Sequence, residues 1–360
     1  MKRKLLPYKQ WPSQDLMAWE EAIRAGDFLS DGGAGGHWSD GSKRTIRAAY
    51  RRWLGYLTKN ELEVLQLPPA DRVTPDRLAR YVALLQAEVT PAGVHNYVKH
   101  FRDAIGVMAP DDDWRWLHEL ARRLGYLVIP RNKRPRMVSS HALVELGLDL
   151  MASADEGKLR DLELAILYRD GLIIALLASR PVRRRNLAGI RIGVNLLKDT
   201  TGYRLRFEAH ETKTHTLLEH PLPDWLTPYI KRYLQEYRVL FPGAGDHDGL
   251  WASAKGGMLG SQAIYDRVSR HTQDAFGHSI NLHLFRDCVA TTIALDDPEH
   301  VHIAADLLGH STLEFTQRHY IQAQTREACA TYQDTLQDLH RSLQQKHSID
   351  GGLHPKSIKR

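Results

Sequence analysis

Six side chains in this sequence have the types and the order that a phosphodiester-cleaving protein needs. They are two arginines, two histidines, one lysine and one tyrosine: Arg183, Lys213, His283, Arg286, His310 and Tyr320. Planar guanidinium groups match phosphate oxygens bidentately, so they can hold the negative charge that builds on the non-bridging oxygens during attack. A phenol can be the nucleophile, while imidazole and ammonium groups move protons. Such a set would break a phosphodiester without a metal ion.

The histidines lie in two short motifs. His283 and Arg286 form a His-x-x-Arg box, and residues three apart share one face of a helix. Residues 307–310 read Leu-Leu-Gly-His, which predicts a helix that stops at the glycine and a turn that points His310 back toward the arginines. Tyr320 follows His310 by ten residues, and His319 and Tyr332 are weaker candidates for the nucleophile.

Arg183 and Lys213 are placed by the elements before them. Pro181 restricts Arg180 to extended geometry, so the chain is expected to turn there and to restart a helix with Arg183 near its first turn. The helix dipole disfavours a cation at that place, which favours an anion as its partner. Lys213 lies in a polar run between two strand-like segments, at a hairpin tip that could enter a DNA groove.

The ordered motifs resemble those of the tyrosine recombinase (phage integrase) family. Residues 183–190 match the arginine turn of that family, and residues 308–311 match its Leu-Gly-His-Ser motif. His283 and Arg286 match its His-x-x-Arg box, Lys213 its hairpin lysine and Tyr320 its nucleophile, in order over residues 42–330. Two positions depart from the family pattern: Asn186 replaces its usual glutamate, and Asp287 stands where a second histidine often follows the box arginine.

The resemblance implies a fold and a reaction. The expected fold is mainly α with a small antiparallel β-sheet (α+β), arranged as a two-domain DNA clamp with a helical core-binding domain and a catalytic domain. The expected enzyme is a site-specific DNA recombinase that works through a 3′-phosphotyrosyl intermediate and needs no cofactor. Its expected partners are double-stranded DNA at specific recombination sites, three further copies of the chain in a homotetramer on two such sites, and accessory recombination proteins.

Other interpretations of the same residues remain open. A type IB topoisomerase would use almost the same groups to relax DNA, and a catalytically silent regulator would bind DNA without forming an adduct. A metal site could use pairs such as His300-x-His302 among the 19 histidines, but no His-Glu-x-x-His or Cys-x-x-Cys spacing occurs. We therefore expect no metal ligands.

The composition fits an intracellular nucleic-acid-binding protein of about two domains. The 360 residues include 49 Lys+Arg against 43 Asp+Glu, a net charge of +6. Two cysteines give no disulfide framework, and the longest apolar run, residues 171–178, is too short to cross a bilayer. The expected location is the cytoplasm, on the nucleoid.

Changes in pattern along the chain predict the domain limits. The successive segments are an N-terminal extension with a glycine-rich flexible linker (1–41), the helical core-binding domain (42–128), a basic interdomain linker (129–138), the catalytic domain with its C-terminal helix (139–345) and a polar tail (346–360).

Apolar residues three and four apart predict four helices in the first domain. Ser42 is the expected cap of the first helix, and Thr74-Pro75 and Thr90-Pro91 are expected starts of two others. Basic side chains on the first helix and in the linker are the expected contacts to the DNA backbone: Arg44, Arg47, Arg51, Arg131, Lys133 and Arg134.

Overall fold

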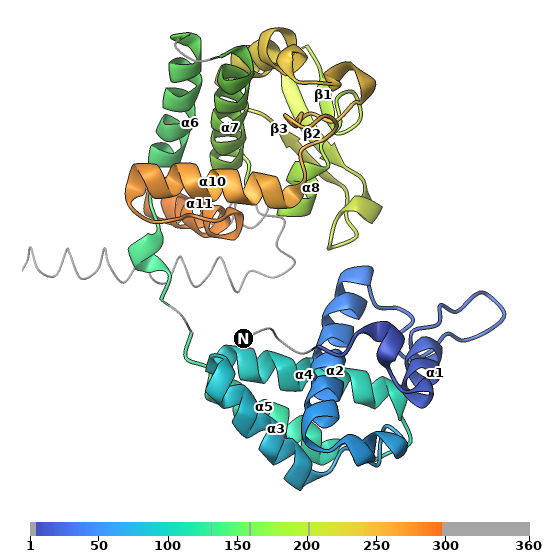
Figure 1. Ribbon diagram of the computed structural model, residues 1–360. Coiled ribbons are helices and arrows are strands. Elements are labelled where there is room, and N and C mark those ends of the chain that lie inside the picture. The colour runs from blue at the N-terminus through green and yellow to red at the C-terminus, as the bar shows by residue number, and fades with distance from the viewer. Residues whose placement is uncertain (1–4, 131, 158–159, 201, 297–360) are drawn as a thin grey trace, which may run out of the picture. The chain divides into compact units, whose positions relative to one another are not determined.

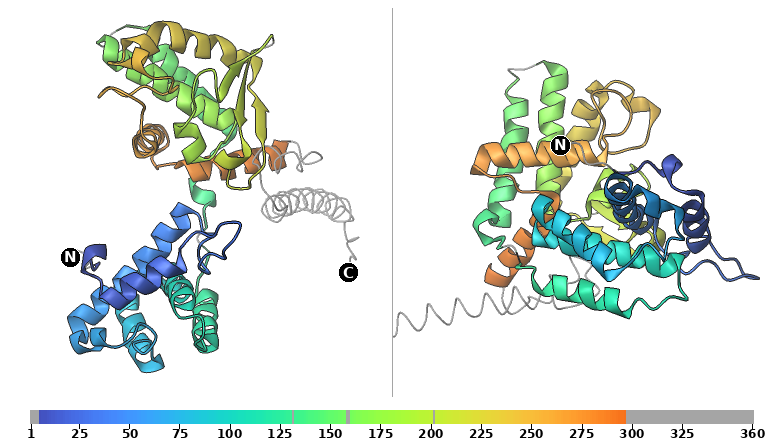
Figure 2. Two further views of the ribbon diagram at one scale, coloured as in Figure 1. Left: turned by 90° about the vertical axis from the view of Figure 1, so that its right-hand side faces the viewer. Right: turned by 60° about the horizontal axis from the view of Figure 1, so that its bottom comes forward.

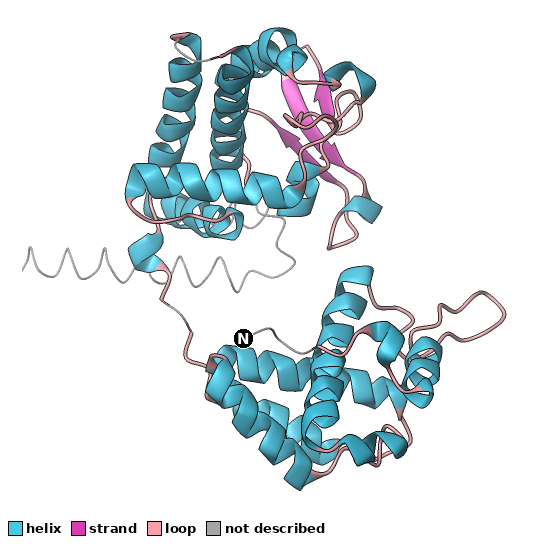
Figure 3. Ribbon diagram, in the orientation of Figure 1, coloured by secondary structure: helices cyan, strands magenta, loops and turns pink. Residues whose placement is uncertain are grey.

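The computed structural model describes residues 5–130, 132–157, 160–200 and 202–296 (Figure 1). It divides into two compact units, Met1–Arg131 and Asn132–Arg360. The division falls inside the basic run that the sequence predicts to be the interdomain linker. Helices dominate both units, and the strands lie in the second (Figure 3). The chain therefore has the mainly α fold with a small sheet that its sequence predicts.

The first unit is built from five α-helices in its described part. They are α1 (Ser13–Ala22), α2 (Asp40–Asn60), α3 (Pro75–Glu88), α4 (Pro91–Met108) and α5 (Arg115–Tyr126). The hydroxyls of Thr74 and Thr90 accept hydrogen bonds from the backbone at the starts of α3 and α4, which confirms both predicted caps. The cap of α2 is Ser39 rather than the predicted Ser42, whose backbone N–H donates to the Ser39 hydroxyl.

An aromatic core holds these helices together. The apolar face predicted for α2 is buried, and Trp53 and Tyr50 on it each contact Phe101 of α4. Tyr81 of α3 meets the Trp53 ring edge-on, with 5.2 Å between ring centroids. Aromatic pairs of this kind add about 0.5–1.5 kcal/mol each beyond the area they bury.

The N-terminal residues belong to this same core, although the sequence predicts an extension over residues 1–41. Trp11 and Trp19 are buried in it. Asp15 of α1 is fully buried and accepts hydrogen bonds from Arg72 Nη1 at 2.7 and 2.8 Å and from the Tyr50 hydroxyl at 2.6 Å. A buried carboxylate needs such partners, so α1 is fixed to the helical unit by charge as well as by apolar contact.

The glycine run of residues 32–36 is also ordered by specific contacts rather than being the predicted flexible linker. The backbone N–H of Gly33 donates to the Arg24 carbonyl at 3.0 Å, and that of Gly35 donates to the Ala22 carbonyl at 2.8 Å. A Cβ atom on Gly33 would lie 2.0 Å from the carbonyl oxygen of Glu21. These glycines therefore allow one chain segment to lie directly against another.

The second unit combines helices with one small sheet (Figure 2). Its described α-helices are α6 (Ser140–Asp155), α7 (Asp161–Ser179), α8 (Arg184–Ala188), α9 (Thr227–Arg232), α10 (Ser261–Phe276) and α11 (Leu282–Asp296). The strands β1 (Leu196–Lys198), β2 (Tyr203–Phe207) and β3 (Leu218–Pro221) pair antiparallel in that order. The register places Leu205 opposite both Leu196 and His220. The first strand begins at Leu196; before it, Arg191 and Ile192 form isolated bridges and residues 193–195 form a turn, whereas the sequence pattern of residues 190–196 predicts a strand.

Helix α7 is the centre of the second unit. All of its residues from Tyr168 to Ala178 are buried, as its apolar sequence predicts. Gly147 of α6 and Gly171 of α7 lie where the two helices meet, and a Cβ atom on Gly171 would be 2.6 Å from the Gly147 carbonyl oxygen. The position of α7 matters because its C-terminus leads directly to Arg183.

Among the described residues, no helix is both long enough and apolar enough to span a bilayer.

The Asp15–Arg72 pair gives the first testable prediction. Replacing Asp15 with Ala leaves a fully buried guanidinium without its carboxylate, which should lower the free energy of unfolding by about 3–5 kcal/mol. Urea unfolding of the whole chain, followed by tryptophan fluorescence, measures this change. Asp112→Ala, at an exposed position of the same unit, is the matched control. Equal stability of the two variants would show that α1 is not part of the folded unit.

Candidate active site

The turn between α7 and α8 positions Arg183. Arg180 ends α7 with φ −140° and ψ 90°, the extended geometry that Pro181 imposes on the residue before it. Arg183 then forms the N-cap of α8, so the predicted turn and helix restart are both present. Its side chain is partly exposed, at the end of a buried helix that cannot shift without disturbing the core.

Arg286 reaches the same turn from α11. Its Nη1 donates a hydrogen bond to the Pro181 carbonyl oxygen at 2.6 Å, and the residue is 7% exposed. Burial and, after it, the neighbouring charge of Arg183 lower the pKa of Arg286 to about 10, although Asp287 opposes both. The two guanidiniums, 103 positions apart in the sequence numbering, therefore lie near enough to repel each other. A bound anion would relieve that repulsion.

His283 lies one turn before Arg286 on α11. Asn281 begins this helix, and its Oδ1 accepts hydrogen bonds from the backbone N–H groups of His283 and Leu284 at 3.1 and 3.0 Å. The His283 side chain reaches the surface, yet the surrounding protein removes enough water to lower the pKa of the imidazole. Lys133 and Arg286 lower this pKa further, and Asp287 opposes them. A neutral imidazole can accept a proton.

Lys213 is exposed in a closed turn of the β2–β3 connection. The Thr212 hydroxyl donates to the Thr216 carbonyl at 2.9 Å and accepts from the Thr216 N–H at 3.1 Å, which closes the turn around Lys213. The amide of Asn186, on α8, donates to the Glu211 carbonyl at 3.4 Å. Asn186, which stands at the position of the glutamate in the family motif, thus links the arginine turn to the chain just before Lys213.

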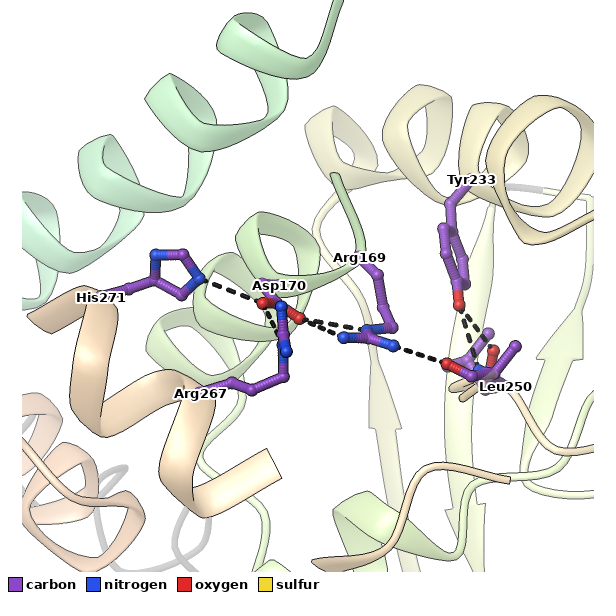
Figure 4. A network of polar contacts seen from close by, with 7 residues as sticks. Arg169, Asp170, Tyr233, Leu250, Arg267 and His271 are labelled. Atoms are coloured by element: carbon purple, nitrogen blue, oxygen red, sulfur yellow. Dashed lines mark hydrogen bonds and ion pairs between the residues drawn. The ribbon is translucent and has the colours of Figure 1, made fainter. Parts of the chain in front are cut away.

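A buried polar network holds the scaffold of the site (Figure 4). Asp170, on α7, accepts hydrogen bonds from Arg169 and from two residues of α10, Arg267 and His271. Arg169 also donates to the Ala252 carbonyl at 2.6 Å. These contacts fix α7 against α10 and against the loop around residue 252, so they secure the helix that ends at the arginine turn.

Two further residues near Arg286 were not expected from the sequence. His220 lies on β3, 9% exposed, and burial lowers the pKa of its imidazole, as do the charges of Arg180 and Arg286. Burial also lowers the pKa of Arg180, whose Nε donates to the Pro221 carbonyl at 2.9 Å. The alternation of β3, with His220 opposite the buried Leu205, is the sequence signal that could have placed His220 inside.

Three predicted residues lie outside the described part of the chain: Arg131, His310 and Tyr320. The structure therefore brings together Arg183, Arg286 and His283 and leaves the placement of His310 and Tyr320 a prediction. The β2–β3 connection that carries Lys213 extends toward the end of the unit where α8 and α11 lie (Figures 1 and 2).

Three of the six predicted DNA contacts, Arg47, Arg51 and Lys133, have the following partners inside the protein. Arg51 Nε donates to the Leu6 carbonyl at 2.9 Å, and the Arg47 guanidinium lies 5.2 Å from the Tyr8 ring centroid. Lys133 forms an ion pair with Asp287 at 2.7 Å. Arg44 is exposed on α2, and Arg134 begins a short 3-10 helix, Arg134–Arg136. Arg47 and Arg51 thus help to hold the N-terminal segment on α2.

Within the described ranges, no cluster of three or more His, Cys, Asp or Glu side chains could hold a metal ion.

Comparisons with known proteins find similar recombinases. The chain is 33% identical over 121 residues to tyrosine recombinase XerD of Pseudomonas aeruginosa, a stretch that covers 33% of this chain and 37% of that protein. It is 24% identical over 255 residues to tyrosine recombinase XerD of Chlorobaculum tepidum, covering 67% and 81% of the two chains. No protein-family model matches the chain.

A solved structure shows the same fold. The crystal structure of the XerH site-specific recombinase bound to its difH substrate, a pre-cleavage complex, matches with a TM-score of 0.54 at 15% identity. The match covers 81% of this chain and 79% of XerH. Fold, relatives and motifs agree: the chain is similar in sequence to tyrosine recombinases and shares the fold of one of them.

The surroundings of His283 predict a measurable pKa. Because burial and two nearby cations outweigh one carboxylate, the pKa of its imidazole should lie below the value of about 6.5 for a free histidine. NMR titration of the histidine ring protons, assigned with a His283→Gln variant, measures it. A midpoint at or above that of the same residue in urea-unfolded protein would contradict the site described above.

Proposed function

We propose that this protein is a site-specific DNA recombinase that cleaves and rejoins DNA through a 3′-phosphotyrosyl intermediate. The observation that carries the proposal is that the Arg286 guanidinium, which donates to the Pro181 carbonyl, lies close enough to Arg183 to feel its charge. Two cations held close together at the surface end of a buried helix form a site for an anion. The scissile phosphate of DNA is the anion that the similarity to tyrosine recombinases suggests.

The nucleophile in this mechanism is Tyr320. Its phenol oxygen forms a bond to phosphorus, its proton passes to His283, and the bond from phosphorus to the 5′-oxygen breaks. A phenol titrates near 10, so at pH 7 it needs a base, and a neutral His283 can act as one. Lys213 protonates the departing 5′-oxygen, which leaves a 3′-phosphotyrosine and a free 5′-hydroxyl.

The remaining groups stabilise the charge of the transition state. Arg183 and Arg286 bind the non-bridging oxygens, and His310 donates a further hydrogen bond to them. The energy of the broken bond is kept in the phosphotyrosine, so a 5′-hydroxyl of a second strand can attack it and rejoin the DNA. This chemistry calls for neither a nucleotide cofactor nor a metal ion.

The proposed partner is double-stranded DNA at specific recombination sites, held between the helical and catalytic units. Strand exchange between two such sites requires four copies of the chain, so we propose a homotetramer on two DNA sites, with accessory recombination proteins where a target demands them. The proposed location is the cytoplasm, on the nucleoid. Arg44, exposed on α2, is the predicted backbone contact that fits this role best, because Arg47, Arg51 and Lys133 already have protein partners.

The nucleophile gives the direct test of this proposal. Tyr320→Phe should abolish covalent attachment to DNA while affinity stays within a few-fold of the parent, because phosphate charges dominate binding. Tyr332→Phe is the matched control and should keep the adduct. The measurement traps adducts on fragmented host DNA under denaturing conditions, and the attached DNA also identifies the target. A denaturant-resistant adduct with Tyr320→Phe would show that another residue attacks.

A further inference from the structure

The ion pair between Lys133 and Asp287 joins the interdomain linker to the residue that directly follows Arg286. Lys133 Nζ lies 2.7 Å from Asp287 Oδ2, and the side chains are 45% and 2% exposed. A carboxylate buried to this degree is costly unless a cation accompanies it. The lysine comes from the first residues of the second unit, 154 positions away in sequence.

The chain after Lys133 continues along α11. The backbone N–H of Val138 donates to Cys288, and that of Ser140 donates to the Thr292 hydroxyl at 2.9 Å. Arg136 donates to the Ser279 carbonyl, just before the helix. The end of the linker is therefore docked on the helix that carries His283 and Arg286, and Lys133 is the first of these contacts.

Asp287 lies where its negative charge could attract both Arg286 and His283. It directly follows Arg286 and lies four residues after His283, on the same face of α11. Its second oxygen, Oδ1, is buried and has no hydrogen-bond partner among the described residues. Asp287 raises the pKa of both Arg286 and His283, whereas Lys133 lowers the pKa of His283. The two members of the ion pair thus act on the imidazole with opposite signs.

We propose that Lys133 is a positioning residue that, by holding Asp287, keeps Arg286 and His283 available to the scissile phosphate and to the tyrosine proton. This inference rests on the proposed function. Without the lysine, the buried carboxylate would turn its attraction to the guanidinium and the imidazole beside it. His283 would then keep its proton up to a higher pH, where it is less able to accept one from the phenol. Lys133 acts through Asp287 in this scheme rather than on a DNA phosphate.

In the described ranges, few charged groups face His283, so the effect of each on its pKa can be tested by substitution. They are Arg286 and Asp287 on its own helix and Lys133 from the linker. Arg183 lies near Arg286, and the charges of Arg286 and Arg180 both reach the buried His220 of β3. Only the Lys133–Asp287 pair can be removed without taking away an arginine or histidine of the site.

A double-mutant cycle tests the inference. Lys133→Met should raise the pKa of His283, move the acid limb of single-turnover cleavage to higher pH and slow cleavage below the His283 pKa, approaching ten-fold for each unit by which the pKa rises. Asp287→Asn should move the limb to lower pH, and the double variant should return to within about three-fold of the parent. Lys255→Met removes an exposed lysine elsewhere in the unit and should change nothing.

Two further readouts decide between the alternatives. If Lys133 contacts a phosphate instead, Lys133→Met should reduce the log–log salt slope of DNA binding by about 0.9, and Asp287→Asn should not rescue it. NMR titration of His283 in the free protein tests the coupling without any cleavage. Loss of cleavage in the parent would overturn the proposed function but not this coupling, whereas equal His283 midpoints in all variants would overturn the coupling alone.

Discussion

The burial of the Arg286 guanidinium next to that of Arg183 is the constraint on which the rest of the site depends. Two like charges in a partly dry environment destabilise each other, and burial lowers the pKa of Arg286 to about 10. The arrangement persists because the backbone around it is fixed. Pro181 presents its carbonyl to Arg286, and α7, buried from Tyr168 to Ala178, holds Pro181 in place. The repulsion that remains is what an incoming phosphate would relieve.

The elements around Arg183 and Arg286 each restrain a neighbouring part of the site. The Asp170 network holds α7 against α10, and Asn186 connects the arginine turn to the chain before Lys213. Lys133 neutralises Asp287, which directly follows Arg286 in the sequence. The site is thus held by internal contacts around the two arginines and exposed at Lys213, the proposed proton donor. Preorganised charge of this kind needs no rearrangement during the reaction.

Local pattern was enough to predict much of the fold. The spacing of apolar residues predicted the buried face of α2, and threonine before proline predicted the starts of α3 and α4. The constraint of Pro181 on Arg180 predicted the turn before Arg183. These features depend on residues within a few positions of each other, which the sequence displays directly. The order of the motifs along the chain likewise predicted its similarity to tyrosine recombinases.

Contacts between distant residues could not be predicted in this way. Asp15 and Arg72 are 57 positions apart, and Lys133 and Asp287 are 154 apart, so periodicity cannot show that either pair meets. The glycines of residues 32–36 suggested freedom, but the same lack of a side chain also allows the close backbone approach that Gly33 makes. His220 was overlooked because a histidine in a short strand carries no mark of the cations that the fold places beside it.

Cleavage of a neutral DNA analogue tests most directly whether the arginine pair neutralises the phosphate. A methylphosphonate replaces one charged non-bridging oxygen of the scissile phosphate with a methyl group, which removes the charge that the guanidiniums hold. We expect Arg183→Ala and Arg286→Ala to lose at least about a hundred-fold in single-turnover cleavage of the ordinary phosphate, the usual cost of removing one such donor. On the methylphosphonate the loss should be much smaller. An equal loss on both substrates would contradict the central role of these two charges.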